Sequence, residues 1–165
     1  TIGWGGSASV SEIGLREAVC NGNYTVYNRD TAATPEERRA TEIKIFGADY
    51  FLCSSNAITE DGVLINIDGN SNRVAAIAYG PSHVVMIVGM NKVAKDEEAA
   101  LSRARNIAAP GRAKQMNRKP PCAVNADRCY DCRSPERICR GLSVLWTKPG
   151  AEECEVVLIG EELGY

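Results

Sequence analysis

The sequence predicts an α/β fold with a three-layer, Rossmann-like architecture built on a mostly parallel sheet. Short apolar runs typical of buried strands alternate with segments of helical periodicity, and no internal repeat or low-complexity linker interrupts them. The size also fits, because 165 residues and 17.8 kDa suffice for one domain with a sizeable core. We therefore expect a single domain over residues 1–165.

The first elements follow one another in a regular order. Residues 1–4 have the composition of the end of a strand, and a helix is predicted from Ser9, as its N-cap, to about Cys20. A second strand is expected over residues 24–28 and a second helix after Thr34, where a proline occupies the first helical position. Because the chain opens on the tail of a strand, we expect a further segment to precede it in the whole protein.

The rest of the chain continues the alternation. A helix capped by Asp96 is expected to direct Ala100, Ala104 and Ile107 toward the core. Strands are predicted over residues 49–56, 83–89, 143–148 and 155–160. A hairpin is predicted over residues 57–69 and a short helix over residues 72–80. Strands separated by helices in this way favour a mostly parallel sheet with helices on both faces.

Charge is distributed unevenly along the chain. The net charge is -2, but residues 101–140 carry +7 and the other 125 residues carry -9. Such a basic block is commonly a solvated face, or it balances the negative charge that thiolates leave around a divalent metal. Nucleic-acid binding is disfavoured, because Tyr130 is the only aromatic ring in this block on which bases could stack.

Composition also bears on location. The longest apolar run, residues 84–89, is far shorter than the roughly 20 residues that cross a bilayer, so no membrane span is expected. A domain of this size does not need disulfides, the seven cysteines are an odd number, and no export segment is recognisable in these residues. We therefore expect a cytoplasmic protein.

The turn Gly5-Gly6-Ser7, between the first predicted strand and helix, is the first candidate site. Glycines allow a ligand to approach the backbone closely, and the free N–H groups at the start of a helix attract anions. The alternative is an ordinary tight turn in which Ser7 or Ser9 caps the helix. Both interpretations stay open from the sequence, and the first assigns binding of a small anionic metabolite to Gly5, Gly6 and Ser7.

A second candidate site lies around the predicted hairpin. Loops at the carboxyl ends of strands form the ligand crevice of open α/β sheets, although Asn, Asp and Gly also populate turns for conformational reasons alone. Arg73 is harder to explain in that way, because it would either pair with Asp68 or Glu60 or hold an anionic group of a substrate. The ligand-binding residues predicted here are Asn56, Thr59, Asp68, Asn70 and Arg73.

The third candidate site is a cysteine-rich loop over residues 120–141. Cys122, Cys129, Cys132 and Cys139 follow the pattern C-x6-C-x2-C-x6-C. Two residues between the central pair let both thiolates reach one metal, and six-residue spacers are long enough to bring back the outer pair. An iron–sulfur cluster, a zinc ion and free thiols stay open as alternatives. The other cysteines, Cys20, Cys53 and Cys154, are expected to be small buried hydrophobic residues.

Several stretches spread over nearly the whole chain form a recognisable set. They are GGS before a helix, NAITEDGVLINIDGNSNRVAAIAYGP, VVMIVGMNKV, RNIAAP, the four-cysteine block with RIC, and the closing VVLIGEELGY. Together they resemble the LUD-domain family, a group associated with lactate utilisation. The resemblance implies the fold shared by glucosamine-phosphate deaminases, ribose-phosphate isomerases and CoA transferases, and the cysteine block suggests a subgroup.

The resemblance also implies a role. Members of the family participate in oxidising lactate to pyruvate with iron–sulfur partner proteins, which slightly favours a cluster over zinc at the cysteines. A glutamate is the nucleophile in the CoA-transferase relatives, so Glu60 is predicted as the catalytic carboxylate. Two hypotheses result: a subunit of a lactate-oxidising system or transferase-like enzyme, and a non-catalytic metal-binding, electron-transfer or assembly module. No nucleotide cofactor is assigned, and the oligomeric state is left open.

Overall fold

The computed structural model describes residues 1–165, and the chain divides into two compact units. The first unit contains Thr1–Ser54, Ala75–Met90 and Lys148–Gly164, and the second contains Ser55–Val74, Asn91–Thr147 and Tyr165. That the two units act together as one domain over residues 1–165 stays a prediction. None of the helices has the length and apolar character needed to span a bilayer.

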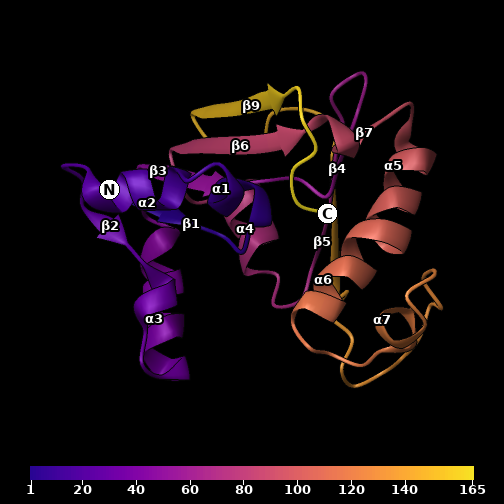
Figure 1. Cartoon of the computed structure of the whole chain (residues 1–165). Helices are drawn as coiled ribbons and strands as arrows, with labels where there is room; N and C mark the ends of the chain where they lie inside the picture. The colour runs from indigo at the N-terminus through magenta and orange to yellow at the C-terminus, as the bar shows by residue number, and fades with distance from the viewer. The chain divides into compact units, whose positions relative to one another are not determined.

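A five-stranded parallel sheet forms the centre of the first unit (Figure 1). In spatial order its strands are β2 (Val26–Tyr27), β1 (Ile2–Trp4), β3 (Tyr50–Cys53), β6 (His83–Gly89) and β9 (Glu153–Ile159), and all neighbours run parallel. The chain passes from β1 to β2 on one side and then crosses to β3 on the other. In sheets with this order, the boundary between β1 and β3 is the topological switch point, where ligands bind.

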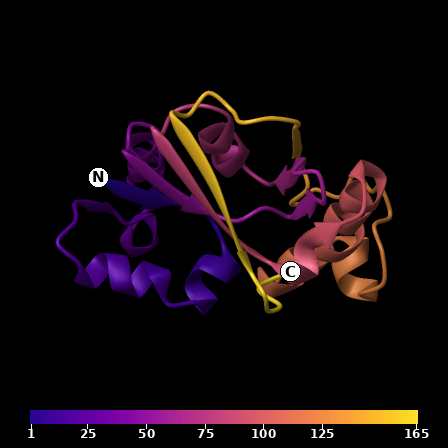
Figure 2. The same ribbon diagram turned by 90° about the horizontal axis from the view of Figure 1, so that it is seen from above.

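Helices cover both faces of this sheet. Ile2 and Trp4 of β1 pack with Val10 of α1 (Ala8–Glu12) and with α2 (Leu15–Asn21). Gly3 faces the other way, because a Cβ added to it would lie 2.6 Å from Cγ1 of Ile45 in α3 (Pro35–Ile45). Successive strand residues point to opposite faces, so α1–α2 and α3 lie on opposite sides, as Figure 2 shows from above. The predicted three-layer α/β class is confirmed.

The second unit is built on a four-stranded sheet. Its spatial order is β7 (Val93–Ala94), β4 (Ala57–Thr59), β5 (Leu64–Asp68) and β8 (Gly141–Leu145). The pair β4–β5 is the predicted hairpin, and Gly62 in its turn has a φ of 94°, which favours glycine. The core of this unit contains Ala57 and Ile65 from the sheet and Ala100 and Ala104 from the helical stretch, whose small side chains let helix and sheet approach closely.

The helical stretch of the second unit runs through three segments. α5 (Glu97–Arg103) continues into a π-helical turn, η3 (Ala104–Ala108), and then into α6 (Ala109–Gln115). A short helix, α7 (Pro121–Asn125), opens the cysteine-rich loop. The remaining helical segments of the chain are η1 (Arg29–Thr31), α4 (Asn72–Ala78) and η2 (Met90–Lys92).

Two helix caps follow the sequence prediction, and the first helix departs from it. The Thr34 hydroxyl accepts a hydrogen bond from the Glu37 N–H at 3.1 Å, and the Asp96 carboxylate accepts one from the Ala99 N–H at 2.8 Å. The single helix predicted from Ser9 to Cys20 is wrong, because Gly14 has a φ of 72° and separates α1 from α2. The first N-cap is also Ser7 and not Ser9.

The predicted inner face of the α5 helix is partly wrong. Ala100 and Ala104 are fully buried, but Ile107 is 56% exposed. A π-helical turn holds one residue more than an α-helical turn, so the next inward position falls one residue later. Ala108 is buried there in place of Ile107.

Candidate functional site

The predicted site residues fall in both units, and the turn Gly5-Gly6-Ser7 belongs to the first. It follows β1 at the carboxyl edge of the five-stranded sheet, beside the switch point. The Ser7 hydroxyl accepts a hydrogen bond from the Val10 N–H at 3.2 Å and caps α1. Neither glycine has a positive φ, so left-handed backbone conformation does not explain why glycine occupies these positions.

The side chain of Arg16 fixes the orientation of this turn. Its Nη2 donates to the carbonyl oxygens of Gly5 and Ser7 at 3.1 and 2.9 Å. A trans peptide directs its N–H opposite to its carbonyl, so the N–H groups of Gly6 and Ala8 point away from Arg16. The Ala8 N–H opens α1 and has no acceptor within the helix. The turn therefore presents backbone donors on the side that Arg16 leaves open.

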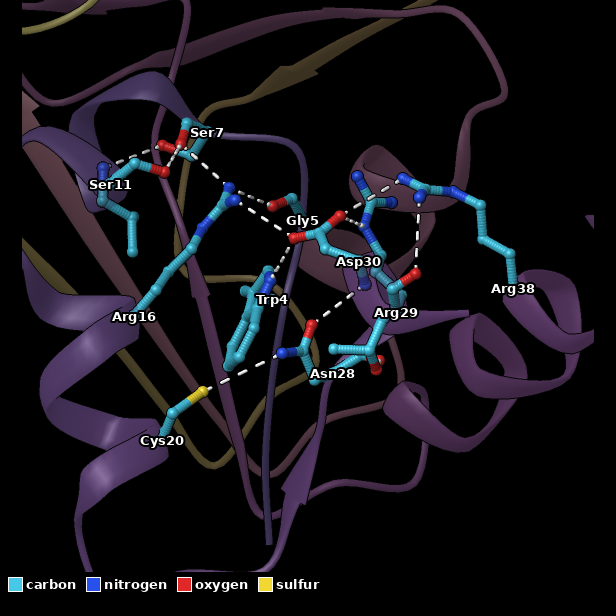
Figure 3. Close-up of polar contacts among 12 residues, drawn as sticks. Trp4, Gly5, Ser7, Ser11, Arg16, Cys20, Asn28, Arg29, Asp30 and Arg38 are labelled. Carbon is cyan, nitrogen blue, oxygen red and sulfur yellow. Dashed lines mark hydrogen bonds and ion pairs between the residues drawn. The ribbon is translucent and has the colours of Figure 1, made fainter. Parts of the chain in front are cut away.

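A cluster of charged residues around Asp30 adjoins the turn (Figure 3). The Asp30 carboxylate accepts hydrogen bonds from the Trp4 indole N–H at 2.9 Å and from Arg16 at 3.1 Å. Arg38 also donates to it at 3.5 Å, and Arg29 forms an ion pair with it at 3.8 Å. These residues come from the ends of β1 and β2 and from α2 and α3, so the fold gathers them at the carboxyl edge of the sheet.

The Asp30 cluster carries a surplus of positive charge. Arg16, Arg29 and Arg38 face the carboxylates of Asp30 and Glu42, and Arg29 is bonded to Glu42 at 2.7 Å. Burial lowers the pKa of Arg29, and the neighbouring Arg38 lowers it further. Three guanidinium groups against two carboxylates leave one net positive charge, which favours an anion at this edge of the sheet.

The second unit holds the predicted ligand-binding residues of the hairpin. Arg73 is buried, and its guanidinium donates to Asn66 Oδ1 at 2.5 Å, Asn56 Oδ1 at 3.0 Å and the Ile67 carbonyl at 2.8 Å. The Asn56 side chain in turn accepts a hydrogen bond from the Ile67 N–H at 2.7 Å. Arg73 and Asn56 are thus brought together, and these contacts tie the hairpin to α4.

Asp68 and Thr59 use their side chains within the fold. The Asp68 carboxylate accepts hydrogen bonds from the backbone N–H groups of Gly69, Arg73 and Val74 at 3.0, 2.9 and 3.2 Å, which fixes the start of α4. The Thr59 hydroxyl accepts from the Val63 N–H at 2.7 Å and donates to Asp61. Asn70 is exposed. The geometry of Asp68 and Thr59 is that of turn and cap residues.

Glu60 adjoins Thr59 but lies at the opposite end of the hairpin from the other predicted residues. The register pairs Ala57 with Ile65 and places Glu60 in the turn, whereas Asn56, Asp68 and Arg73 lie beyond the far ends of the strands. Four residues of extended chain correspond to about 13 Å. Asn56, Asp68 and Arg73 are therefore not grouped around Glu60, because an antiparallel hairpin separates its turn from its strand ends. The catalytic role of Glu60, whose side chain is exposed, stays a prediction.

The cysteine-rich loop is attached to the second unit at several points. The Arg140 N–H donates to the Asp68 carbonyl at 2.9 Å, and the Cys129 N–H donates to Asn106 Oδ1 at 2.9 Å. A Cβ on Gly69 would lie 3.2 Å from the Ile138 carbonyl oxygen, so glycine permits the close approach of the two segments there. The loop is therefore held against both the hairpin and the helical stretch.

Nitrogen donors are directed at two of the four sulfur atoms. Arg105 Nη2 lies 3.7 Å from Cys129 Sγ, and Arg137 Nη2 lies 3.4 Å from Cys139 Sγ. The backbone N–H of Asp131 also donates to Cys129 Sγ at 3.4 Å. Asp131 has a φ of 46°, a left-handed conformation that only glycine adopts readily and that Asp tolerates.

The four thiols share one electrostatic neighbourhood. Burial raises the pKa of Cys122, and Cys132, Cys139 and Cys129 each raise it further. No three side chains of the types His, Cys, Asp and Glu stand around a common metal position in this structure. Of the remaining cysteines, Cys53 is buried as expected, Cys154 is half-buried and Cys20 is exposed, so the prediction for Cys20 is wrong.

One comparison with known proteins decides the family. The family model of the LUD domain matches residues 1–159. The chain belongs to the LUD domain family. The cysteine-rich loop of this LUD domain lies inside the matched region. No curated protein matches the chain. A solved structure, a DUF162 family protein from Deinococcus radiodurans, is similar at 12% identity and a TM-score of 0.46, covering 97% of this chain and 87% of that chain.

Sequence reasoning missed the Asp30 cluster of this LUD domain. Arg16, Asp30 and Arg38 are separated by 14 and 8 positions, and their side chains meet only when the strands are placed side by side. The available signal was the pair Arg29-Asp30, directly after the strand predicted over residues 24–28. Charged residues at that point belong to the carboxyl edge of a parallel sheet, where sites are expected.

Proposed function

We propose that this LUD domain binds a small anionic metabolite beside the Gly5-Gly6-Ser7 turn and acts in the oxidation of lactate to pyruvate with iron–sulfur partner proteins. Family membership supports the pathway. One structural observation carries the binding site: the turn follows β1 at the switch point of the five-stranded sheet, with its backbone oriented by Arg16. A carboxylate is the chemical group that such a turn would accept.

The chemistry of the turn fits a hydroxy acid better than a neutral ligand. Backbone N–H groups and the net positive charge of the Asp30 cluster both favour a carboxylate. α1 has only five residues, so the contribution of its dipole is small and the N–H groups themselves must provide most of the attraction. Because the cluster is internally paired, it supplies a field and a rigid support, and the ligand contacts are assigned to the turn.

Calorimetric titration with L-lactate, D-lactate and pyruvate tests this proposal. Gly6→Val should abolish binding, because its branched side chain would occupy the space in front of the N–H groups. Gly47→Val is the matched control: Gly47 is exposed, and the nearest neighbour of an added Cβ is the Lys44 carbonyl oxygen at 3.8 Å. Unchanged affinity in Gly6→Val, or no binding of any of the three acids to the unaltered chain, would contradict the proposal.

Glu60 is our candidate for the principal functional carboxylate in this role. It is exposed at the turn of the hairpin, whereas the Asp68 carboxylate accepts a backbone hydrogen bond at the start of α4. The cytoplasm is the compartment we infer, since the odd number of cysteines and a chain length sufficient for a core do not call for disulfides.

A second candidate function is favoured by the cysteine-rich loop. Nitrogen donors aimed at sulfur atoms fit a non-catalytic metal-binding, electron-transfer or assembly module. In that case the chain would take part in lactate oxidation by carrying a cofactor or docking a partner, and the metabolite could bind elsewhere in the assembly. Loss of lactate oxidation in cysteine variants that still bind the metabolite would favour this function.

A further inference from the structure

The cysteine-rich loop contains an arrangement that free thiols do not require. Three N–H donors point at the sulfur atoms of Cys129 and Cys139: two are guanidinium groups, and one is a backbone amide. A neutral thiol is a weak acceptor, whereas a thiolate is a strong one. Donors directed at sulfur therefore make these two positions suitable for sulfur that carries negative charge, as metal-bound sulfur does.

The two arginines come from different parts of the second unit. Arg105 lies in the π-helical turn η3 and also pairs with Asp131 at 2.8 Å. Arg137 lies within the loop, and its Nη1 donates to the Cys132 carbonyl at 2.7 Å. Both guanidinium groups are thus held in place by a second contact before they reach sulfur. That support makes them positioned partners and not chance neighbours.

The charges of the group match those of a thiolate metal centre. Four thiolates around a divalent ion leave a net charge of about -2, and the common iron–sulfur clusters with four cysteine ligands carry a similar charge. Arg105 and Arg137 supply two positive charges in direct contact with sulfur. Hydrogen bonds to ligand sulfurs are a general way in which proteins stabilise such centres.

We infer that Cys122, Cys129, Cys132 and Cys139 together bind one thiolate-ligated metal centre, and that Arg105 and Arg137 act as positioning residues that donate hydrogen bonds to its sulfur ligands. A zinc ion and an iron–sulfur cluster share this ligand chemistry. Loading a divalent ion converts four thiols into four thiolates and releases four protons to solvent, with no change of oxidation state. The inference is independent of the proposed metabolite site.

The loop is anchored in a way that suits closure around a metal. Its contacts at Asn106 and Asp68 are made by backbone N–H groups of Cys129 and Arg140, so these two anchors do not use the thiols. Glu136 adds a further contact by accepting from the Lys119 N–H at 2.7 Å. The backbone is therefore fixed near the thiols, and convergence on a metal requires movement chiefly of the segments between these anchors.

Metal analysis of the whole chain, purified without oxygen, is the first test. About one zinc per chain, or several irons with visible absorbance, is expected, and the two results distinguish the two kinds of centre. A chain purified without metal should take up Zn²⁺, or iron with sulfide, after treatment with a reductant. Four freely titratable thiols after both reconstitutions, or two disulfides that reform without metal, would overturn the inference.

Substitutions then identify the ligands and the role of the arginines. Cys132→Ser should lose the metal, whereas Cys20→Ser, outside the group, should retain it. Arg105→Gln and Arg137→Gln should weaken Zn²⁺ binding about 10- to 100-fold in competition with a chromophoric chelator. Arg133→Gln is the control, because it removes the same charge from an exposed side chain of the loop. Equal weakening by all three would show that only overall charge matters and would overturn the positioning role.

The metabolite titration separates this inference from the proposed function. Cys132→Ser should bind lactate or pyruvate as the unaltered chain does, and Gly6→Val should retain the metal. Because reconstitution uses the unaltered chain, a folding failure in any single variant leaves the principal test intact.

Discussion

The Asp30 cluster and the cysteine-rich loop both gather arginines, but the acceptors of those arginines differ. In the Asp30 cluster, Arg16 and Arg29 donate to the carboxylates of Asp30 and Glu42. In the loop, Arg105 and Arg137 meet sulfur atoms, although Arg105 also contacts Asp131. The first region pairs opposite charges within the chain and keeps one positive charge in excess, whereas the second gains negative charge on sulfur only when its thiols lose their protons.

The pKa values of the arginines move in opposite directions in the two regions. Burial lowers the pKa of Arg29, whereas the hydrogen bond to Cys129 raises the pKa of Arg105 and that to Cys139 raises the pKa of Arg137. Desolvation therefore dominates the shift at Arg29, and hydrogen bonding to sulfur dominates the shifts at Arg105 and Arg137. The contrast indicates a structural role for the Asp30 cluster and a ligand-dependent role for the loop.

The largest expected effect concerns Glu60, which belongs to neither region. Glu60→Gln should lower partner-dependent lactate oxidation by about 100-fold, because an amide can act neither as a nucleophile nor as a base. The free energy of unfolding should change by no more than about 0.5 kcal/mol, as for other exposed residues. Glu155→Gln, an exposed residue of β9, is the control. Full activity in Glu60→Gln would move the functional site toward the cysteine-rich loop.

Removal of metal should affect one region and spare the other. A chelator should increase amide hydrogen exchange in residues 120–141 by about 10-fold or more, because the loop would lose its crosslink. Residues 28–38 should change by less than about twofold, since none of the four cysteines of the loop belongs to their network. Equal changes in both segments would remove the distinction between a network formed within the chain and a ligand-dependent one.

Asp30→Asn should destabilise the protein by about 1 to 2 kcal/mol, measured by urea unfolding at neutral pH. The substitution leaves three guanidinium groups facing the Glu42 carboxylate alone. We place the effect in the lower part of the range for charged hydrogen bonds, because the Asp30 side chain is 39% exposed and partly screened by water. A change below about 0.5 kcal/mol would show that the Asp30 cluster is no more structural than the loop.

Acid should remove the same contribution. Burial raises the pKa of Asp30, but the Trp4 indole and the charges of Arg29, Arg16 and Arg38 outweigh it and hold the pKa below its usual value. The stabilisation is therefore complete above the unfolded-state pKa of about 3.9 and is lost as the pH falls through the folded-state pKa. The difference in unfolding free energy between Asp30→Asn and the unaltered chain should shrink toward zero as the pH falls through the folded-state pKa of Asp30, measured by urea unfolding over a series of acidic pH values.

The smallest effect is expected for the carboxylate of the loop. Asp131 pairs with Arg105, but its side chain is 83% exposed, so Asp131→Asn should change stability by less than about 0.5 kcal/mol. Its backbone N–H, which is directed at Cys129, is unaltered by the substitution, and the amide oxygen of asparagine can still accept the hydrogen bond of Arg105. Zn²⁺ affinity should therefore stay within about twofold of the unaltered chain. A loss of tenfold or more would assign to the carboxylate a part that we assign to the amide and to Arg105.

Local chemistry made much of the fold predictable. Local patterns predicted the caps at Thr34 and Asp96 and the hairpin around Gly62. Each of these features depends on residues within a few positions of one another, so it can be recognised in the sequence. The break at Gly14 was missed because glycine is also tolerated within helices, and only its φ reveals the break. The π-helical turn was missed because no residue type is characteristic of such a turn.

The candidate sites were predictable in part for the same reason. The cysteines of the loop are close in sequence, so their spacing alone indicated a common site. Arg73 contacts Asn56 across 17 positions, and the hairpin register that separates Glu60 from Asn56 depends on which strand ends meet. Periodicity predicts that strands pair, but it does not show which polar side chains meet at their ends.

The π-helical turn has a consequence for the phase of the helix that contains it. Adding one residue to a turn rotates everything that follows by about 100° relative to an uninterrupted α-helix. Ala109 and Ala113 are buried in that rotated phase, while Arg105 and Asn106 within the turn contact the cysteine-rich loop. Deleting one residue between Ala104 and Ala108 would leave an ordinary α-helix, but it would rotate one of these two groups out of position. The extra residue therefore allows one continuous helical stretch to pack its alanines into the core and also to contact the cysteine-rich loop, which a regular α-helix could not do at these positions.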